Sequence, residues 1–319
     1  MRFFRKTTID FMAKRKLWYT ISASVILIGI GSVAIKGFHY GVDFLGGTEL
    51  IIEFSQPPDM GKIRTMLDNS GFPKSEIKGY GSPTRILLRT EAQGEGTSVG
   101  DQIKAALQTT FPELQPKMLQ EQKIGPKVGK ELRRNAFYAV LASVIAMGLY
   151  VAFRFQFIYG IGAIVALIHD VLVVMGFISL LDGLTPYTNF EIDQNMIAAF
   201  LTIVGLSMND TVVIFDRIRE NRKIYRTMGL PELINKSLNE TLSRTIITSG
   251  TIFVITLILF FLGGEVNRGF AFALTIGITT GTYSSIYIAS AAVLDYTNYR
   301  QAKKLSQMTV GKPQYEAVQ

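Results

Sequence analysis

The sequence has no cysteine and little histidine. The absence of cysteine among its 319 residues excludes disulfides, thiolate nucleophiles and cysteine-based metal sites. Only two histidines are present, which argues against a dedicated zinc or haem site. The sequence also lacks a phosphate-binding glycine loop and an H-E-x-x-H motif, so it contains no motif for ATP hydrolysis or for zinc proteolysis. We therefore expect no metal, no cofactor and no enzymatic activity.

Charge is scarce as well. Charged residues make up 18% of the chain, against about 25% in a typical soluble domain, and hydrophobic residues make up 48%. This balance excludes a disordered chain and is unusual for a soluble enzyme. The formal charge is +8, from 33 Lys and Arg against 25 Asp and Glu. Where these charges lie is more informative than their sum.

The apolar residues are clustered into stretches that are each long enough to cross a hydrocarbon core of about 30 Å, which needs roughly 20 residues. The stretches are Leu17–Ile35, Asn135–Phe153, Phe155–Leu181, Met196–Phe215, Thr245–Leu262 and Gly269–Leu294. The first exceeds the roughly 7–15 apolar residues of a signal peptide and precedes no small-residue cleavage site, so we interpret it as an uncleaved helix. The sequence predicts a polytopic α-helical membrane protein with six transmembrane helices.

Basic residues predict the orientation of these helices. Lys and Arg are frequent before the first helix, between the fourth and fifth, and after the sixth, whereas residues 182–195 contain none. Because short basic segments stay cytoplasmic, we predict that both termini are cytoplasmic. The cytoplasmic parts are then residues 1–16, a loop at 216–244 and a tail at 295–319, and helices two to six lie within 135–294.

Residues 36–134 fall on the opposite side of the membrane, where long segments are largely exempt from the charge rule. Strands are expected at Thr48–Phe54, Ser75–Tyr80, Thr84–Arg89 and Leu114–Ile124, helices at Asp59–Ser70 and Val99–Thr110, and a loop at Gln93–Gly96. The order β-α-β-β-α-β predicts a small α+β, ferredoxin-like periplasmic domain between the first two transmembrane helices. Without cysteine, this domain must rely on core packing.

Polar residues interrupt three of the apolar stretches. His169 and Asp170 lie in the third, Asn209 and Asp210 in the fourth, and Arg244 at the start of the fifth. Ionisable residues within a span are costly and often mark ion pathways. If helix five begins near position 238, the helix rise brings Arg244 to about the depth of Asp210. An Asp210–Arg244 pair would keep the carboxylate ionised until a proton releases the arginine, as a proton pathway requires.

Structural roles for the same residues stay open at this point. Glu240 lies four residues before Arg244, where the two can form an ordinary helical ion pair, or Arg244 is an interfacial cation. Asp210 can form a structural hydrogen bond with Asn209 or Ser207. The helix rise puts Asp170 roughly 13 Å from the level of Asp210, so we expect a polar contact rather than proton transfer from His169 and Asp170.

Five motifs in order along the chain resemble the SecD/SecF family of the resistance-nodulation-division superfamily. They are GVDFLGGT at 41–48, ALIHDV at 166–171, VGLSMNDT at 204–211, DRIREN at 216–221 and LNETLSRT at 238–245. Asp43, Gly46 and Gly47 belong to the first motif. The layout of six helices with one large first loop extends the resemblance to nearly the whole chain. The size of that loop is similar to the SecF type rather than to the SecD type.

The resemblance implies an accessory subunit of the Sec preprotein translocase in the bacterial inner membrane, which couples ion flow, with protons favoured over sodium, to late-stage export. It implies a SecD heterodimer, the SecYEG channel, the YajC and YidC membrane proteins, unfolded preprotein and membrane lipid as partners, and no nucleic acid. The family's membrane aspartate and arginine fall on Asp210 and Arg244, and Thr248 lies one turn beyond. Asn209, His169 and Asp170 would be supporting polar residues.

Two other functions are compatible with some of these residues. A lipid or drug exporter of the same superfamily would share the charged fourth helix, but it usually carries two six-helix halves in one chain. An intramembrane aspartyl protease would use Asp170 and Asp210 as a dyad, with carboxylates within about 5 Å of each other. The estimated difference in depth argues against the protease.

Overall fold

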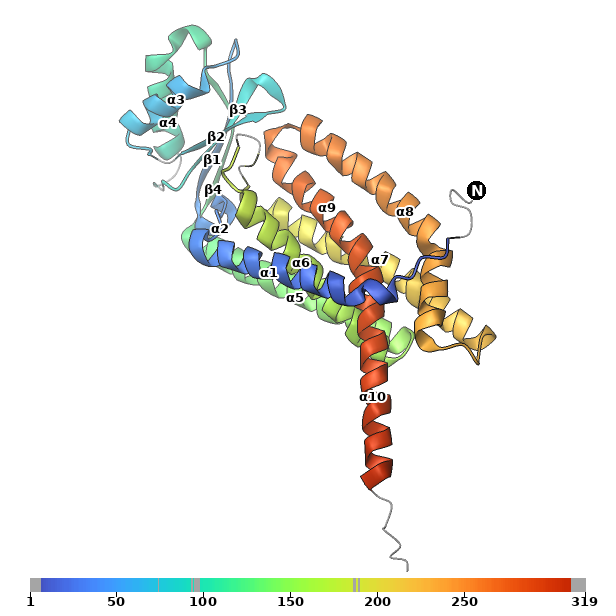
Figure 1. The fold of residues 1–319 in the computed structure, drawn as a ribbon. Coiled ribbons are helices and arrows are strands. Elements are labelled where there is room, and N and C mark those ends of the chain that lie inside the picture. The colour runs from blue at the N-terminus through green and yellow to red at the C-terminus, as the bar shows by residue number, and fades with distance from the viewer. Residues whose placement is uncertain are drawn as a thin grey trace, which may run out of the picture.

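The computed structural model describes residues 7–310 except 74, 93, 95–97, 186, 187 and 189. Most of the predicted loop Gln93–Gly96 and the outer parts of both predicted terminal segments, 1–6 and 311–319, therefore lie outside the described residues. The described chain forms a helical bundle with a small α+β domain at one end (Figure 1). We call that end of the bundle the domain end. The opposite end, where the N-terminal arm (residues 7–14) and the turn at residues 225–229 lie, is the basic end.

The bundle consists of long helices that follow the predicted apolar stretches. They are α1 (Arg15–Lys36), α5 (Pro126–Arg154), α6 (Phe157–Leu181), α7 (Gln194–Ile224), α8 (Leu230–Leu262) and α9 (Gly264–Ser284), followed without a break by the π-helical turn η3 (Ser285–Ala289) and α10 (Ser290–Val310). Within the described residues, five helices are long and apolar enough to cross a membrane: Met12–Lys36, α5, α6, α7 and α8. The expected sixth span, Gly269–Leu294, is divided among α9, η3 and α10 and is not one of the five.

At the basic end, α7 and α8 extend well beyond their apolar stretches. α7 continues past Phe215 to Ile224, and α8 begins at Leu230, well before Thr245. Most of the segment 216–244, which we expected to be a loop, is therefore a helical hairpin. The hairpin is stable because its inward-facing side chains are buried and because the Asn221 amide donates hydrogen bonds to Ser237 (3.0 Å) and Glu240 (2.8 Å).

The α+β domain has the predicted order of elements. These are β1 (Gly47–Glu53), α3 (Met60–Asn69), β2 (Glu76–Tyr80), β3 (Ser82–Thr90), α4 (Ser98–Thr110), the short η2 (Pro112–Leu114) and β4 (Lys117–Ile124). The strands form one antiparallel sheet in the order β2-β3-β1-β4. Alternating residues such as Leu50 and Ile52 pack against Ile63 of α3 and Ile103 of α4 in a buried core. Asp59 caps α3 by accepting hydrogen bonds from Gly61 and Lys62.

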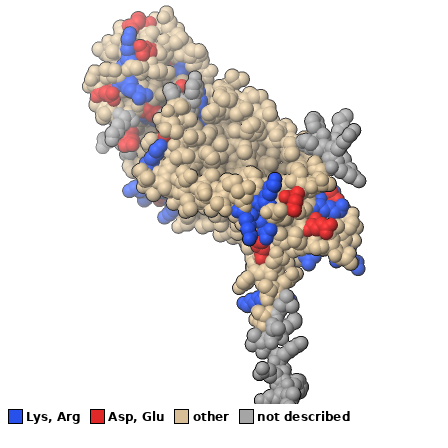
Figure 2. Space-filling view, in the orientation of Figure 1, with Lys and Arg blue, Asp and Glu red and all other residues tan. Residues whose placement is uncertain are grey.

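Charged side chains gather near the two ends of the molecule in the view of Figure 2, with a largely uncharged surface between them. In the bundle, exposed apolar side chains are frequent on α1, α5 and α8, for example Leu27, Tyr138 and Ile255. The buried apolar side chains of the bundle form two clusters, one toward each end. A surface of this kind is what a helix bundle presents to lipid or to other helices.

Candidate ion site in the helical bundle

Asp210 lies in α7 and faces α8. Its carboxylate is 6% exposed, and its Oδ2 accepts a hydrogen bond of 2.7 Å from the Ser249 hydroxyl of α8. Ser249 belongs to a buried stripe of hydroxyl residues on one face of α8, at steps of one or two helical turns: Ser237, Thr241, Thr245, Ser249 and Thr256. The packing of α7 on α8 thus provides a donor for a carboxylate that is removed from water.

Arg244 does not pair with Asp210 in the described part of the chain. It is exposed and forms no ion pair with any described residue. Arg244 lies five residues before Ser249, so the helix rise places it about 7.5 Å from the Ser249 level, toward the basic end. Our estimate of equal depth assumed a later start of helix five. The ordinary pair with Glu240 is also absent, because Glu240 contacts Lys236 (3.2 Å) and Arg217 (3.7 Å).

Thr248 and Asn209 flank the site without bonding to Asp210. The Thr248 hydroxyl donates to the backbone oxygens of Arg244 (2.9 Å) and Thr245 (3.1 Å) in its own helix. Asn209 is exposed on the outer surface of α7. The structural alternative, in which Asp210 bonds Asn209 or a serine of its own helix, is not observed among the described residues.

His169 and Asp170 form a second buried polar cluster between α6, α7 and α9. Asp170 is 1% exposed, and its Oδ2 accepts hydrogen bonds from Ser207 of α7 (2.6 Å) and Ser284 of α9 (2.9 Å). Its Oδ1 lies 2.9 Å from His169 Nδ1, and His169 Nε2 lies 3.1 Å from the Tyr283 hydroxyl. The cluster therefore joins three helices through polar contacts.

The contact with Ser207 corrects the expected depth of Asp170. Ser207 is three residues before Asp210, so Asp170 lies close to the level of Asp210, about one helical turn away and not 13 Å. The estimate was wrong because it counted from the ends of the apolar stretches, whereas α7 runs on to Ile224. Asp170 and Asp210 nevertheless bond serines of different helices and do not bond each other within the described chain.

Sequence reasoning missed Ser249, Ser284 and Tyr283, and it offered Ser207 as a partner of Asp210, whereas Ser207 bonds Asp170. Ser207, Ser249, Ser284 and Tyr283 are uncharged, so they did not interrupt the apolar pattern. The regular spacing of hydroxyls along α8 was a signal that could have found Ser249. No comparable signal existed for Ser284 and Tyr283, because their contacts depend on how α9 is rotated against α6.

The glycine motif connects the α+β domain to the helix of Asp210. Asp43, in the short helix α2 (Val42–Leu45), accepts a hydrogen bond of 3.2 Å from the backbone N–H of Gln194, the first residue of α7. Gly46 has a φ of +84°, and a Cβ there would lie 2.9 Å from Pro126. A glycine is therefore needed where the chain passes closely between β1 and the start of α5.

Buried charges hold the domain against the bundle. Arg89 of β3 is 9% exposed and contacts Glu49 (2.7 Å) and Glu191, just before α7 (2.6 Å). Burial lowers the pKa of Arg89, but the Glu49 carboxylate, together with the charges of Asp193 and Glu76, gives a net rise. Asp193 caps α7 by accepting from Met196 N (2.8 Å), and burial raises its pKa.

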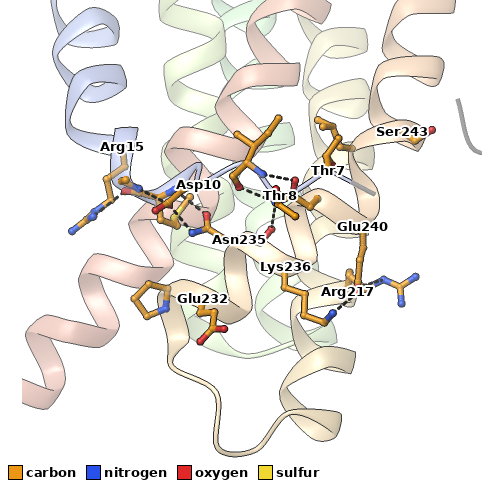
Figure 3. A pocket seen from close by; sticks show the side chains of 16 residues that line it. Thr7, Thr8, Asp10, Arg15, Arg217, Glu232, Asn235, Lys236, Glu240 and Ser243 are labelled. Atoms are coloured by element: carbon orange, nitrogen blue, oxygen red, sulfur yellow. Dashed lines mark hydrogen bonds and ion pairs between the residues drawn. The ribbon is translucent and has the colours of Figure 1, made fainter. Parts of the chain in front are cut away.

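At the basic end, the N-terminal arm is bound to α8 (Figure 3). Asn235 Oδ1 accepts hydrogen bonds of 3.0 Å from the backbone of Phe11 and of Met12, and Asn239 Oδ1 accepts one of 2.9 Å from Ile9. The Asn235 amide donates to Asp10 (2.7 Å), and hydrogen bonds from Ala13 and Asn235 lower the pKa of Asp10. A cavity of about 1020 Å³ lies between the arm and the hairpin.

Two family models match the chain. Residues 102–299 match protein export membrane protein SecD/SecF, C-terminal, and residues 31–58, which contain Gly46 and Gly47, match the SecD/SecF GG motif. These descriptions refer to membrane proteins of protein export and not to an enzyme family. In the described residues, no group of three or more histidine, aspartate or glutamate side chains is placed to hold a metal ion.

Curated proteins and solved structures agree with these matches. Protein translocase subunit SecF of Rhodothermus marinus is 45% identical over 295 residues, 92% of this chain and 95% of that protein. Protein translocase subunit SecDF of Thermus thermophilus is 41% identical over 90% of this chain and 39% of its own length. A crystal structure of SecDF from Thermus thermophilus, described as a translocon-associated membrane protein, has a TM-score of 0.76 at 38% identity and covers 92% of this chain and 39% of that one.

Proposed function

The chain belongs to the SecD/SecF family of protein export membrane proteins, and we propose that it is the SecF-type subunit that couples ion flow across the bacterial inner membrane to late-stage preprotein export. A role in protein export follows from the family and from relatives named as translocase subunits. The single observation that carries the coupling is Asp210, a buried carboxylate in an apolar helix with a hydroxyl donor and no paired cation among the described residues. Protons are the ion we favour, because a carboxylate held by one hydroxyl can take up a proton without a coordination shell.

The proposed topology has six transmembrane helices and cytoplasmic termini. α9, η3 and the first part of α10 would form the sixth span, since they continue as one helix through Gly269–Leu294. The abundance of Lys and Arg at the hairpin between α7 and α8 supports a cytoplasmic basic end. The α+β domain would then be periplasmic, and its sheet order β2-β3-β1-β4 with two helices supports a ferredoxin-like fold.

We propose that the α7–α8 face binds a SecD-type partner. Asn209 and Arg244 are polar and exposed on this face, and lipid is a poor environment for both. Gly205 and Gly250 also open outward, with no atom within 4 Å of a Cβ built at either position. Small residues of this kind let another helix approach closely. SecDF of Thermus thermophilus, in which this chain matches 39% of the length, supports a second half of the same assembly.

In the proposed mechanism, the charge of Asp210 controls the contact between α7 and α8. Ionised Asp210 accepts from Ser249, while protonated Asp210 can act as a donor instead. Arg244, which lies about 7.5 Å away along α8, can approach the ionised carboxylate when the two helices slide or when the partner covers them. Each elementary charge that crosses a potential of 100 mV releases about 2.3 kcal/mol. That free energy would drive movement of the external domains, which helps to draw out a preprotein delivered by the SecYEG channel, with YajC and YidC as further partners.

The test is preprotein transport into inverted membrane vesicles, with and without a membrane potential. We expect Asp210→Asn and Arg244→Met to assemble with the SecD-type partner, to keep ATP-driven transport and to lose stimulation by the potential. The matched control is Asp68→Asn, which removes an exposed carboxylate from α3. An Asp210→Asn protein that assembles and still responds fully to the potential would remove Asp210 from the ion path.

A further inference from the structure

The strongest feature that the proposed function does not use is the hydrogen-bonded chain through His169. It runs from the Tyr283 hydroxyl to His169 Nε2 (3.1 Å), and from His169 Nδ1 to Asp170 Oδ1 (2.9 Å). His169 and Asp170 are 6% and 1% exposed, and Tyr283 is half-buried. These hydrogen bonds thus lead from the fully buried carboxylate of Asp170 to the Tyr283 hydroxyl, which is closer to the bundle surface.

The electrostatic balance of this cluster depends on one proton. No Lys or Arg pairs with Asp170 in the described structure, and its other contacts are the hydroxyls of Ser207 and Ser284. A carboxylate in such an environment is stable when an opposite charge compensates it. The imidazole of His169 is the one contacting group that can carry that charge. The His169–Asp170 pair has no net charge when both ring nitrogens are protonated, and it has one negative charge when Nε2 is deprotonated.

The hydrogen bonds fit both forms. In the protonated form, Nδ1–H donates to Asp170 and Nε2–H donates to the Tyr283 oxygen. In the other form, the Nε2–H bond is broken, the proton has left to water, and the Tyr283 O–H donates to Nε2 instead. Nδ1–H stays on Asp170 throughout. Only one N–H bond therefore changes, and both ring nitrogens keep a hydrogen-bond partner in either form.

The surroundings of the pair connect it to moving parts of the bundle. Ser207 is in the same stretch of α7 as Asp210, three residues earlier. Tyr283 and Ser284 immediately precede the π-helical turn Ser285–Ala289, a local feature that occurs frequently at functional sites. α7 and α9 also pack closely here, since a Cβ on Gly281 would lie 3.0 Å from the Ser207 side chain.

We propose that His169 and Asp170 together bind one exchangeable proton and form a second proton site, one helical turn from Asp210. The titratable groups that face the pair are Tyr283 of α9 and, one turn along α7, Asp210. Loss of the proton leaves the hydroxyls of Ser207 and Ser284 as the main compensation for the Asp170 charge. The hydrogen bonds from these hydroxyls to the charged carboxylate then hold α6, α7 and α9 together most strongly. Uptake of the proton weakens this contact between the three helices. This role rests on the proposed function, whereas proton binding itself does not.

Nuclear magnetic resonance of the ring nitrogens tests proton binding directly. The chain contains two histidines, so His39→Gln leaves His169 as the single histidine signal of a ¹⁵N-histidine-labelled chain. The full chain would be reconstituted in lipid with unlabelled SecD-type partner and titrated between about pH 5 and pH 9. We expect both ring nitrogens to be protonated at the acid end, with Nε2 alone losing its proton as the pH rises. A ring with one protonated nitrogen over the whole range would overturn the proposal.

Two variants test whether the proton on His169 depends on the Asp170 carboxylate. Asp170→Asn should lower the doubly protonated fraction of His169 at about pH 7 by roughly tenfold, because the compensating charge is lost. Tyr287→Phe is the control, since Tyr287 stacks on Trp18 and does not contact His169. An unchanged fraction in a folded Asp170→Asn protein contradicts the proposal. If vesicles of the wild type show no response to the potential, the proposed function fails, while the resonance of His169 still decides the proton site.

Discussion

The Ser249 hydroxyl of α8 donates a hydrogen bond of 2.7 Å to the Asp210 carboxylate of α7, and both side chains are buried. This bond joins α7 and α8 at one level, and Ser249 is the sole side-chain donor to Asp210 in the described chain. Ionised Asp210 can only accept this hydrogen bond, whereas protonated Asp210 can also donate one. The charge of one residue is thereby linked to the packing of two helices.

The first prediction concerns this bond. Ser249→Ala should lower the free energy of unfolding by about 2 kcal/mol, because a hydrogen bond to a charged group is lost and a buried acceptor remains. In an Asp210→Asn background, Ser249→Ala should lower the free energy of unfolding by clearly less. The measurement is denaturant unfolding in mixed micelles, as a double-mutant cycle. Thr251→Val is the control, since the Thr251 hydroxyl bonds only within its own helix. Equal costs in both backgrounds would show that the carboxylate charge does not strengthen the bond.

The second prediction concerns the proposed partner face. Gly250→Leu should leave the isolated chain folded, because no atom lies within 4 Å of the new Cβ. It should reduce recovery of the SecD-type partner in affinity purification by at least about tenfold, which corresponds to about 1.4 kcal/mol. Gly31→Leu is the matched control, because Gly31 of α1 is equally open but lies on another helix. If both variants recover the partner equally well, the partner does not bind at α7–α8.

The third prediction concerns pH. Burial raises the pKa of Asp193 above its ordinary value of 3.8. The stability linked to this group is therefore complete below about pH 3.8 and is lost as the pH rises through the folded-state pKa. Asp193→Asn keeps the cap on α7 and removes the titration, so at neutral pH it should be at least as stable as the wild type.

Unfolding at several pH values measures this effect. The two proteins should converge in acid and diverge as the pH rises. Asp193→Ala provides the comparison, because it removes the titration and the cap together, and loss of a cap costs about 1 kcal/mol. An Asp193→Asn protein that is less stable than the wild type at neutral pH would mean that the attraction to Arg89 outweighs burial.

The fourth prediction concerns the N-terminal arm. Replacing Asn235 and Asn239 with Ala removes hydrogen bonds to the backbone of Ile9, Phe11 and Met12. Each such bond contributes about 1 kcal/mol, so trypsin should cleave at Lys14–Lys16 at least about tenfold faster. Glu232→Ala is the control, because this exposed residue of α8 lines the same cavity and has no contact with the arm in Figure 3. Unchanged cleavage would show that other contacts hold the arm.

Local sequence patterns were sufficient to predict a helical membrane protein and the order of elements in the α+β domain. These features are local. The length of an apolar stretch sets the length of a spanning helix, and the alternation at Leu50 and Ile52 is the period of a strand with one buried face. Asp59 and Gly71 marked the ends of α3 to within a residue for the same reason.

Tertiary structure alone decided which polar residues meet. The depth of Asp170 was misjudged, and the direct Asp210–Arg244 pair is replaced by Asp210–Ser249, because a contact between helices depends on their rotation and on the offset between their ends. Apolar length fixes neither quantity. α7 and α8 extend beyond the apolar stretches through inward-facing residues such as Asn221, and this extension shifts every level counted from an assumed end. A shift of one helical turn is about 5.4 Å, which is enough to exchange one hydrogen-bonding partner for another.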